Sequence, residues 1–135
     1  MERMAKPVAT LPALEAEAVA LRAALTSAKR VLLTAPLPAD GDSVGSQLAM
    51  RMIIKRHFPN LDVRIVNEDV LPDRYRHLPG ASELELPARY LPGDFDVGIV
   101  VDGGEERLGA AQELFRACKT KVQVDHHAIG HEFPY

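Results

Sequence analysis

The sequence predicts an α/β fold, with a doubly wound, mainly parallel sheet and helices on both faces. Three observations support this prediction. Short apolar runs alternate with longer segments in which apolar residues recur at three- and four-residue steps, as strands alternate with helices in such folds. The run Phe95–Val101 is almost continuously apolar, which is typical of a strand buried on both faces. Several of these runs end at acids, and in open α/β sheets the carboxyl ends of the strands form the ligand-binding edge.

Residues 1–29 are expected to form an N-terminal tail and helix ahead of the main domain, residues 30–135. The first ten residues predict a loose tail. The segment from Leu11 to about Lys29 is rich in Ala, Leu and Glu and predicts an amphipathic helix. The apolar face of this helix would carry Leu14, Ala18, Leu21 and Leu25. The first strand is expected at Arg30–Thr34.

A turn and a second helix follow this strand. Two prolines, Pro36 and Pro38, forbid regular structure, and Ala39–Asp42 predicts a turn. Ser43 is expected to cap a helix over Val44–His57. Three apolar residues of that helix are expected to face the sheet: Leu48, Met52 and Ile53.

The second half of the chain predicts three more strands. The second strand is expected at Leu61–Val66 and the third at Phe95–Val101. Between them, the proline-rich stretch Asn67–Asp94 predicts a short helix around Asp73–His77 and an extended piece near Glu83–Leu86. The last two expected elements are a helix from Glu105 to about Cys118 and a strand at Lys121–Val124.

Length and composition limit the kinds of function to consider. The 135 residues are the size of one domain, and the net charge of -3 argues against a broad basic surface for long duplex nucleic acid. A small phosphorylated substrate is still compatible, because bound metal ions reverse the sign of an acidic pocket. The single cysteine, Cys118, cannot form an internal disulfide, and no apolar stretch is long enough to span a bilayer. These features predict a cytoplasmic protein that does not insert into a membrane.

The strongest chemical signal is the run Asp125-His126-His127 after the last apolar strand. Two consecutive imidazoles are costly if buried without partners, which makes chance placement in a core an unconvincing explanation. One imidazole can ligate a metal while the other acts on substrate, and Asp125 can orient an imidazole. Oxygen and imidazole ligands without thiolate suit a divalent ion such as manganese.

Acids elsewhere have both an ordinary and a functional interpretation. Asp40 and Asp42 flank Gly41, and a turn or capping role is common for such residues. Their spacing also allows both carboxylates to face one cation, with Gly41 permitting an unusual backbone. Asp102 ends the third strand. Arg107 is expected in the first turn of a helix, where the helix dipole disfavours a cation. Its functional interpretation is a contact with a phosphate or with an acid of the site. Its ordinary interpretation is a solvated surface arginine.

Together these residues resemble the DHH phosphoesterase superfamily in the order and spacing of three motifs. The motifs are Asp40-Gly41-Asp42-Ser43-Val44-Gly45-Ser46, Asp102 with Arg107-Leu108-Gly109, and Asp125-His126-His127. The resemblance covers the chain from about Arg30 to His127. The first motif is most similar to the branch of nanoRNA exonucleases that also dephosphorylate 3′-phosphoadenosine-5′-phosphate.

The resemblance implies a hydrolase that acts on phosphodiester or phosphomonoester bonds with two Mn²⁺ ions, Mg²⁺ being the alternative ion. The substrate would be a short oligonucleotide or a small phosphorylated nucleotide. Four residues would be metal ligands by position: Asp40, Asp42, Asp102 and His126. His127 would contact the phosphate or assist proton transfer, and Arg107 would belong to the catalytic set.

The sequence departs from the family pattern in three places. The first motif of the family begins with a metal-binding histidine four residues before the first aspartate, and that position is Pro36 here. The asparagine that often follows the double histidine is replaced by Gly130. A further metal-binding aspartate and a C-terminal substrate-binding domain are expected beyond Tyr135, so residues 30–135 would be the N-terminal portion of a DHH domain.

Two alternatives to the hydrolase follow from these residues. One is a degenerate DHH module that binds metal or nucleotide without catalysis, which Pro36 favours. The other is a receiver-like signalling domain, which requires an acid pair directly after the first strand and a lysine at the end of a late strand. Here the acid pair lies several residues further on and the late strand ends in Asp125-His126-His127, so the receiver ranks last. A homodimer is compatible with the sequence.

Overall fold

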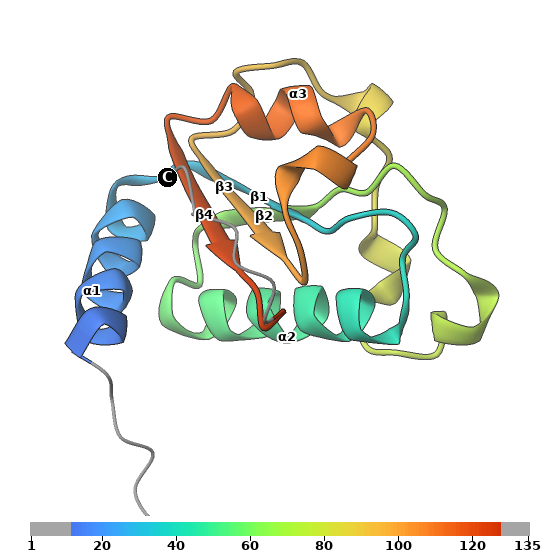
Figure 1. Ribbon diagram of the computed structural model, residues 1–135, viewed down its shortest axis with the longest axis horizontal. Helices are drawn as coiled ribbons and strands as arrows, with labels where there is room; N and C mark the ends of the chain where they lie inside the picture. Colours follow the sequence, from blue (N-terminus) through green and yellow to red (C-terminus); the bar gives the residue numbers. More distant parts are fainter. Residues whose placement is uncertain (1–11, 128–135) are drawn as a thin grey trace, which may run out of the picture.

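The computed structural model describes residues 12–127 and confirms the predicted α/β fold. Its four strands are parallel and lie in the order β2-β1-β3-β4. Helices cover both faces, with α2 on one side and α3 on the other (Figure 1). The strands are β1 (Arg30–Thr34), β2 (Asp62–Ile65), β3 (Val97–Val101) and β4 (Thr120–Val124), and the helices are α1 (Pro12–Ser27), α2 (Gly41–His57) and α3 (Ala111–Arg116).

The two faces of the sheet bury separate apolar clusters. Along β1, Val31 and Leu33 join the cluster on the α2 side, whereas Leu32 joins the cluster on the α3 side, as expected for alternating side chains of a strand. On the α3 side, a Cβ added at Gly98 would lie 2.8 Å from the ring of Phe115. The glycine in β3 therefore lets α3 pack directly against the sheet.

Helix α2 is confirmed, but its buried face differs from the predicted one. Leu48 is buried as expected, whereas Met52 and Ile53 are 65% and 56% exposed. The buried face is centred on Gln47 and Ile54, and at 100° per residue Met52 and Ile53 fall beyond its two sides. Gln47 is polar, so an apolar pattern alone assigns the wrong face to this helix.

Polar contacts explain why a glutamine occupies the buried face of α2. The side-chain amides of Gln47 and Asn67 exchange two hydrogen bonds, of 2.8 and 2.9 Å. Asn67 Oδ1 also accepts the backbone N–H of Ala35, at 3.1 Å. This amide pair joins the first half of α2 to the chain that leaves β1 and β2.

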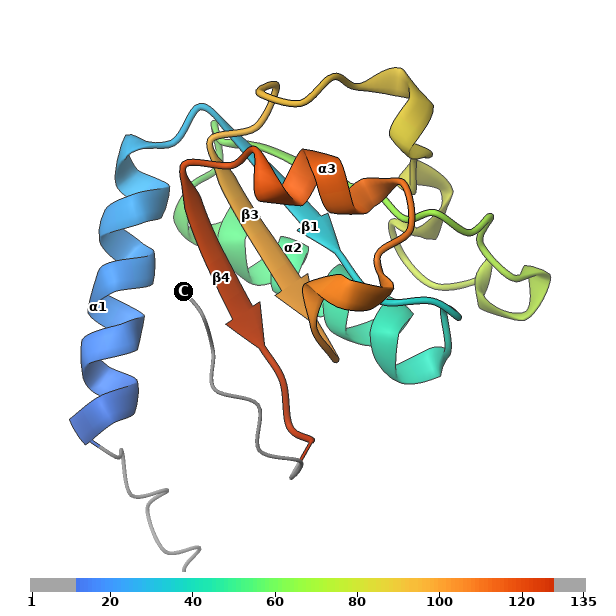
Figure 2. The ribbon, with the colours of Figure 1, turned by 45° about the horizontal axis from the view of Figure 1, so that its top comes forward.

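Helix α1 packs on the domain through its C-terminal half. Leu25 is buried and Leu21 is partly buried against the sheet cluster, whereas Leu14 and Ala18 are exposed. The predicted apolar face is therefore wrong for its first two members. Figure 2 shows the reason, because α1 lies beside β4 and reaches the sheet mainly where it leads into β1. The predicted tail, residues 1–10, lies outside the described residues.

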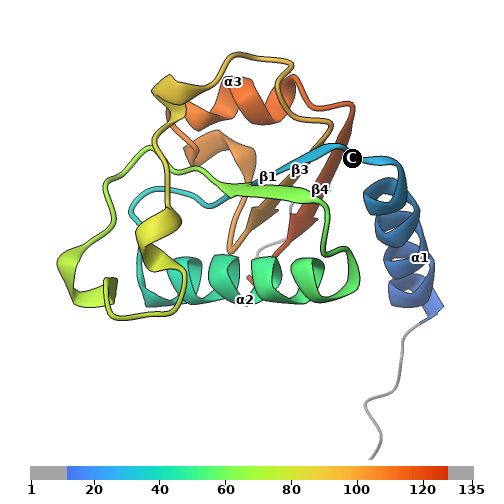
Figure 3. The ribbon, with the colours of Figure 1, turned by 180° about the vertical axis from the view of Figure 1, so that it is seen from behind.

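The segment between β2 and β3 runs along the β2 side of the sheet (Figure 3). It contains short 3-10 turns at Asp73–Tyr75, Ala81–Glu83 and Pro87–Arg89. The predicted helix near Asp73 is therefore a single turn. The predicted extended piece is present as one parallel bridge between Val66 and Glu85.

The helix predicted from Glu105 to Cys118 is wrong as one continuous element. The chain forms a 3-10 turn at Glu105–Arg107 and then the short helix α3. Gly109 separates them with a φ of 58°, a left-handed conformation that ends the first turn. Within residues 12–127, no helix has the length and apolar character needed to cross a membrane.

Candidate metal centre

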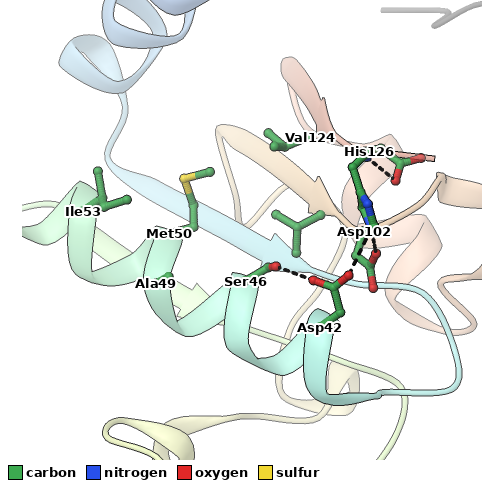
Figure 4. A pocket seen from close by; sticks show the side chains of 10 residues that line it. Asp42, Ser46, Ala49, Met50, Ile53, Asp102, Val124 and His126 are labelled. Carbon is green, nitrogen blue, oxygen red and sulfur yellow. Dashed lines mark hydrogen bonds and ion pairs between the residues drawn. The ribbon is translucent and has the colours of Figure 1, made fainter. Parts of the chain in front are cut away.

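The carboxyl ends of β3 and β4 bring acids and imidazoles to one edge of the sheet. Asp102 follows β3, and Asp125, His126 and His127 follow β4. One ligand atom from each of these four residues lies within 4.8 Å of the others. Asp42 approaches the same place from the first turn of α2 (Figure 4).

His126 joins the acids of two different elements. Its Nε2 lies 3.0 Å from Asp42 Oδ2 and 3.1 Å from Asp102 Oδ1. A neutral imidazole has at most one hydrogen on this nitrogen, so it cannot donate fully to both carboxylates. Three of the four residues predicted as ligands therefore have ligand atoms directed toward one another.

Asp102 is held in an unusual backbone conformation. Its φ is 62°, in the left-handed region that aspartate tolerates better than most residues. Its N–H donates to the carbonyl of Val124 at 2.9 Å, which ties the turn to the end of β4. The carboxylate is only 8% exposed, with Oδ1 toward His126 and Oδ2 accepting the Ser43 hydroxyl at 2.9 Å.

Asp40 is the N-cap of α2, which corrects the prediction that Ser43 caps this helix. Asp40 Oδ1 accepts the backbone N–H of Ser43 at 2.8 Å, and the helix begins at Gly41. This backbone hydrogen bond is the main reason that the pKa of Asp40 is lowered from its ordinary value. The ordinary capping role is therefore present, and a metal-ligand role for Asp40 stays a prediction.

Asp125 contacts the other imidazole. Its Oδ1 pairs with Nδ1 of His127 and accepts the N–H of His126 at 2.8 Å. The side-chain hydrogen bond to Asp125 raises the pKa of His127. Burial raises the pKa of Asp125, but the hydrogen bonds from His127 and His126 outweigh burial and lower it. The contact fixes Nδ1 of His127 and leaves Nε2 as the nitrogen that can meet a ligand.

Two residues singled out in the sequence contribute no ligand atom to this cluster. Arg107 is exposed, and its carbonyl accepts the N–H of Leu37 at 2.8 Å. Among residues 12–127 its guanidinium forms no ion pair with an acid of the site, so its catalytic role stays a prediction. Pro36 is buried beside Asp102, because a Cβ added at Gly103 would lie 2.5 Å from Pro36 Cγ. Gly130 lies outside the described residues.

A cleft of about 430 Å³ opens beside the cluster. Its polar end is formed by Asp42, Ser46, Asp102, Asp125 and His126. Its apolar walls are Ala49, Met50 and Ile53 of α2 and Val101 and Val124 of the strands (Figure 4). Sequence reasoning missed these walls, because the exposure of Ile53 depends on the rotation of α2 about its own axis.

The donor set fits a divalent cation. Carboxylate oxygens and imidazole nitrogens are ligands that manganese and magnesium accept, with imidazole favouring the former. Among the described residues, no lysine or arginine forms an ion pair with Asp42, Asp102 or Asp125. In this part of the chain, the ion-pair partners of these three acids are the imidazoles of His126 and His127. The sequence predicted that Asp125 orients an imidazole, and its carboxylate does contact His127, while its atoms also lie close enough to the other three groups to join a metal site.

Fold and strand-end cluster together define a parallel α/β domain with a candidate metal centre at its carboxyl edge. The solved structure of an exopolyphosphatase-related protein from Bacteroides fragilis is similar to this chain, with a TM-score of 0.76 and 21% sequence identity. The similarity covers 87% of this chain and 36% of that one, so the present chain spans well under half of its length. At this identity the likeness shows a shared fold. No protein-family model matches the chain.

Proposed function

We propose that the chain carries the metal centre of a phosphoester hydrolase of the DHH type, working with two Mn²⁺ ions or, alternatively, Mg²⁺. One observation carries the proposal: Nε2 of His126, Oδ2 of Asp42 and Oδ1 of Asp102 converge from three elements. Convergent ligand atoms without a permanent cationic partner are what a divalent ion requires. The similar fold of an exopolyphosphatase-related protein supports a hydrolase of phosphorylated compounds.

Each residue of the cluster has a proposed role. Asp42, Asp102 and His126 would hold the ions, with Asp40 as a further ligand from the start of α2. Bound divalent ions would neutralise phosphate charge and make water more acidic. His127, held through Nδ1 by Asp125, would present Nε2 to a phosphate oxygen or move a proton.

The cleft supports an organic phosphoester as the substrate. Its walls are apolar next to the acid–imidazole end, and they include Met50, Ile53 and Val124. Among the described residues that line the cleft there is no lysine or arginine, whereas a chain of inorganic phosphates carries charge along its whole length. We therefore propose a small nucleotide or short oligonucleotide as the substrate class. The cytoplasm is the proposed location of the protein.

A non-catalytic metal- or nucleotide-binding module is the second candidate. The observation that favours it is Pro36, which is buried against Gly103 beside Asp102 at the position where the family resemblance expects a histidine. A site with fewer ligands would bind ions less tightly, and the loss of one ion would remove hydrolysis while leaving binding of the other.

Mn²⁺ titration and hydrolysis assays on the whole chain test both candidates. The hydrolase predicts Mn²⁺-dependent cleavage of a dinucleotide or of an aromatic phosphodiester, abolished in His126→Ala. His77→Ala is a matched control, because His77 is exposed and lies outside the cluster. Mn²⁺ binding without cleavage would support the non-catalytic module. Absence of Mn²⁺ binding would contradict the hydrolase and the metal-binding form of the second candidate.

A further inference from the structure

Ser43 connects two carboxylates of the candidate site. It lies in the first turn of α2 and is 3% exposed. Its hydroxyl oxygen is 3.0 Å from Asp40 Oδ1 and 2.9 Å from Asp102 Oδ2. Asp40 begins the helix and Asp102 follows β3, so a single side chain links the helix start to the strand end.

The hydroxyl has one hydrogen for two carboxylate oxygens. Asp40 Oδ1 already accepts the backbone N–H of Ser43, at 2.8 Å. The Asp102 carboxylate is nearly buried, and among the described residues its other contact is His126 Nε2, which Asp42 also approaches. Donation of this hydrogen to Asp102 is therefore more stabilising than donation to Asp40, because the nearly buried Oδ2 of Asp102 would otherwise lack a donor.

Donation to Oδ2 also decides which way the Asp102 carboxylate faces. With Oδ2 tied to Ser43, Oδ1 is the oxygen directed at His126 and Asp42. Without this hydrogen bond, rotation of the carboxylate plane is limited mainly by a single shared contact with the imidazole. A ligand oxygen that must be ordered on binding lowers the affinity for the ion.

We propose that Ser43 is a positioning residue that fixes the Asp102 carboxylate for cation binding, an inference that rests on the proposed function. The role is separable from helix capping. The cap uses the backbone N–H of residue 43, which a substitution of the side chain leaves in place. Ser43→Ala therefore removes the hydroxyl and keeps the hydrogen bond that begins α2.

Calorimetric titration with Mn²⁺ alone, paired with thermal unfolding of the metal-free chain, tests the proposal. Ser43→Ala is expected to weaken Mn²⁺ binding by about 10-fold, the usual scale for a group that orients a metal ligand. Its metal-free unfolding midpoint should fall by no more than about 5 °C, the scale of one lost hydrogen bond to Asp102 in a domain of this size. Ser43→Thr retains a hydroxyl and should recover most of the affinity. Ser82→Ala, at an exposed serine remote from the cluster, should bind Mn²⁺ like the wild type.

The outcomes separate this inference from the proposed function. Wild-type affinity in Ser43→Ala would overturn the positioning role while leaving the metal centre intact. A loss of affinity accompanied by a large fall in the metal-free midpoint, and not recovered by Ser43→Thr, would make the serine structural and also overturn it. Failure of the wild-type chain to bind Mn²⁺ would overturn the metal centre and the positioning role together.

Discussion

Aspartates occupy both ends of the sheet, but they have different partners. At the amino end, Asp62 meets the guanidinium groups of Arg30 at 2.8 Å and Arg64 at 2.6 Å. Asp96 accepts the backbone N–H groups of Lys29 and Arg30 at 2.7 and 2.9 Å. Each of these carboxylates has permanent donors within the chain, and their contacts hold the strand starts together.

At the carboxyl end, among the described residues, Asp42 and Asp102 have no lysine or arginine as an ion-pair partner. Asp42 and Asp102 share one imidazole nitrogen, and Asp102 also shares the Ser43 hydroxyl with Asp40. The difference teaches that an acid's neighbours, and not its place at a strand end, distinguish a structural carboxylate from a candidate ligand. A carboxylate already matched by arginine has little to gain from a metal ion, whereas these acids have much to gain.

The largest expected effect is at Asp102. Asp102→Asn keeps the shape of the side chain and a residue type that tolerates the left-handed conformation, while it removes the charge. Mn²⁺-dependent hydrolysis should fall by about 100-fold or more. The metal-free chain should be as stable as the wild type or more stable, because a negative charge close to those of Asp40, Asp42 and Asp125 is lost.

Hydrolysis assays and urea unfolding without metal check this prediction together. A large loss of metal-free stability would place Asp102 with the structural acids and break the comparison. Retained Mn²⁺-dependent activity would show that the cluster is not the metal centre.

At Asp62 we expect a smaller effect, which lowers stability and leaves metal binding unchanged. Asp62→Asn removes the charge that faces Arg30 and Arg64, and because the three side chains are partly exposed the loss should be about 1 kcal/mol of unfolding free energy. Mn²⁺ affinity should not change. Urea unfolding measures the first quantity and calorimetry the second, and weakened Mn²⁺ binding would contradict the separation of the two ends.

The smallest effect concerns acid unfolding. Hydrogen bonds from the N–H groups of Arg30 and Lys29 lower the pKa of Asp96 below its ordinary value of 3.8. In Asp62, burial raises the pKa, but the hydrogen bonds from Arg64 and Arg30 outweigh it and the net shift is downward. The unfolded chain therefore binds more protons than the folded chain, and stability falls as pH drops below about 4.

Urea unfolding between pH 5 and about 3 measures this dependence on the metal-free chain. Asp96→Asn should make the curve of stability against pH shallower by a few tenths of a kcal/mol, since its backbone donors are exposed to solvent. An unchanged curve in both Asp96→Asn and Asp62→Asn would show that the amino-end acids do not control acid stability.

The sequence was sufficient to predict the sheet and the meeting of Asp102 with His126, because parallel strands place their carboxyl ends at one edge. It was not sufficient for the face of α2, because Gln47 is buried through a partner, Asn67, that lies 20 residues away. The bridging contact of Ser43 depends on how closely α2 approaches the end of β3, a distance that no local pattern encodes. The break at Gly109 depends on a backbone conformation, which glycine permits without requiring.

Gln47 and Asn67 carry no proton that titrates in the physiological range, so their paired amides are insensitive to acidity and only weakly affected by salt. The buried face of α2 is thus anchored in part by neutral groups, whereas the acids Asp40 and Asp42 lie at the N-terminal end of the helix. Under the proposed function, exchange of cations at the edge of the sheet would therefore leave this contact of the helix in place.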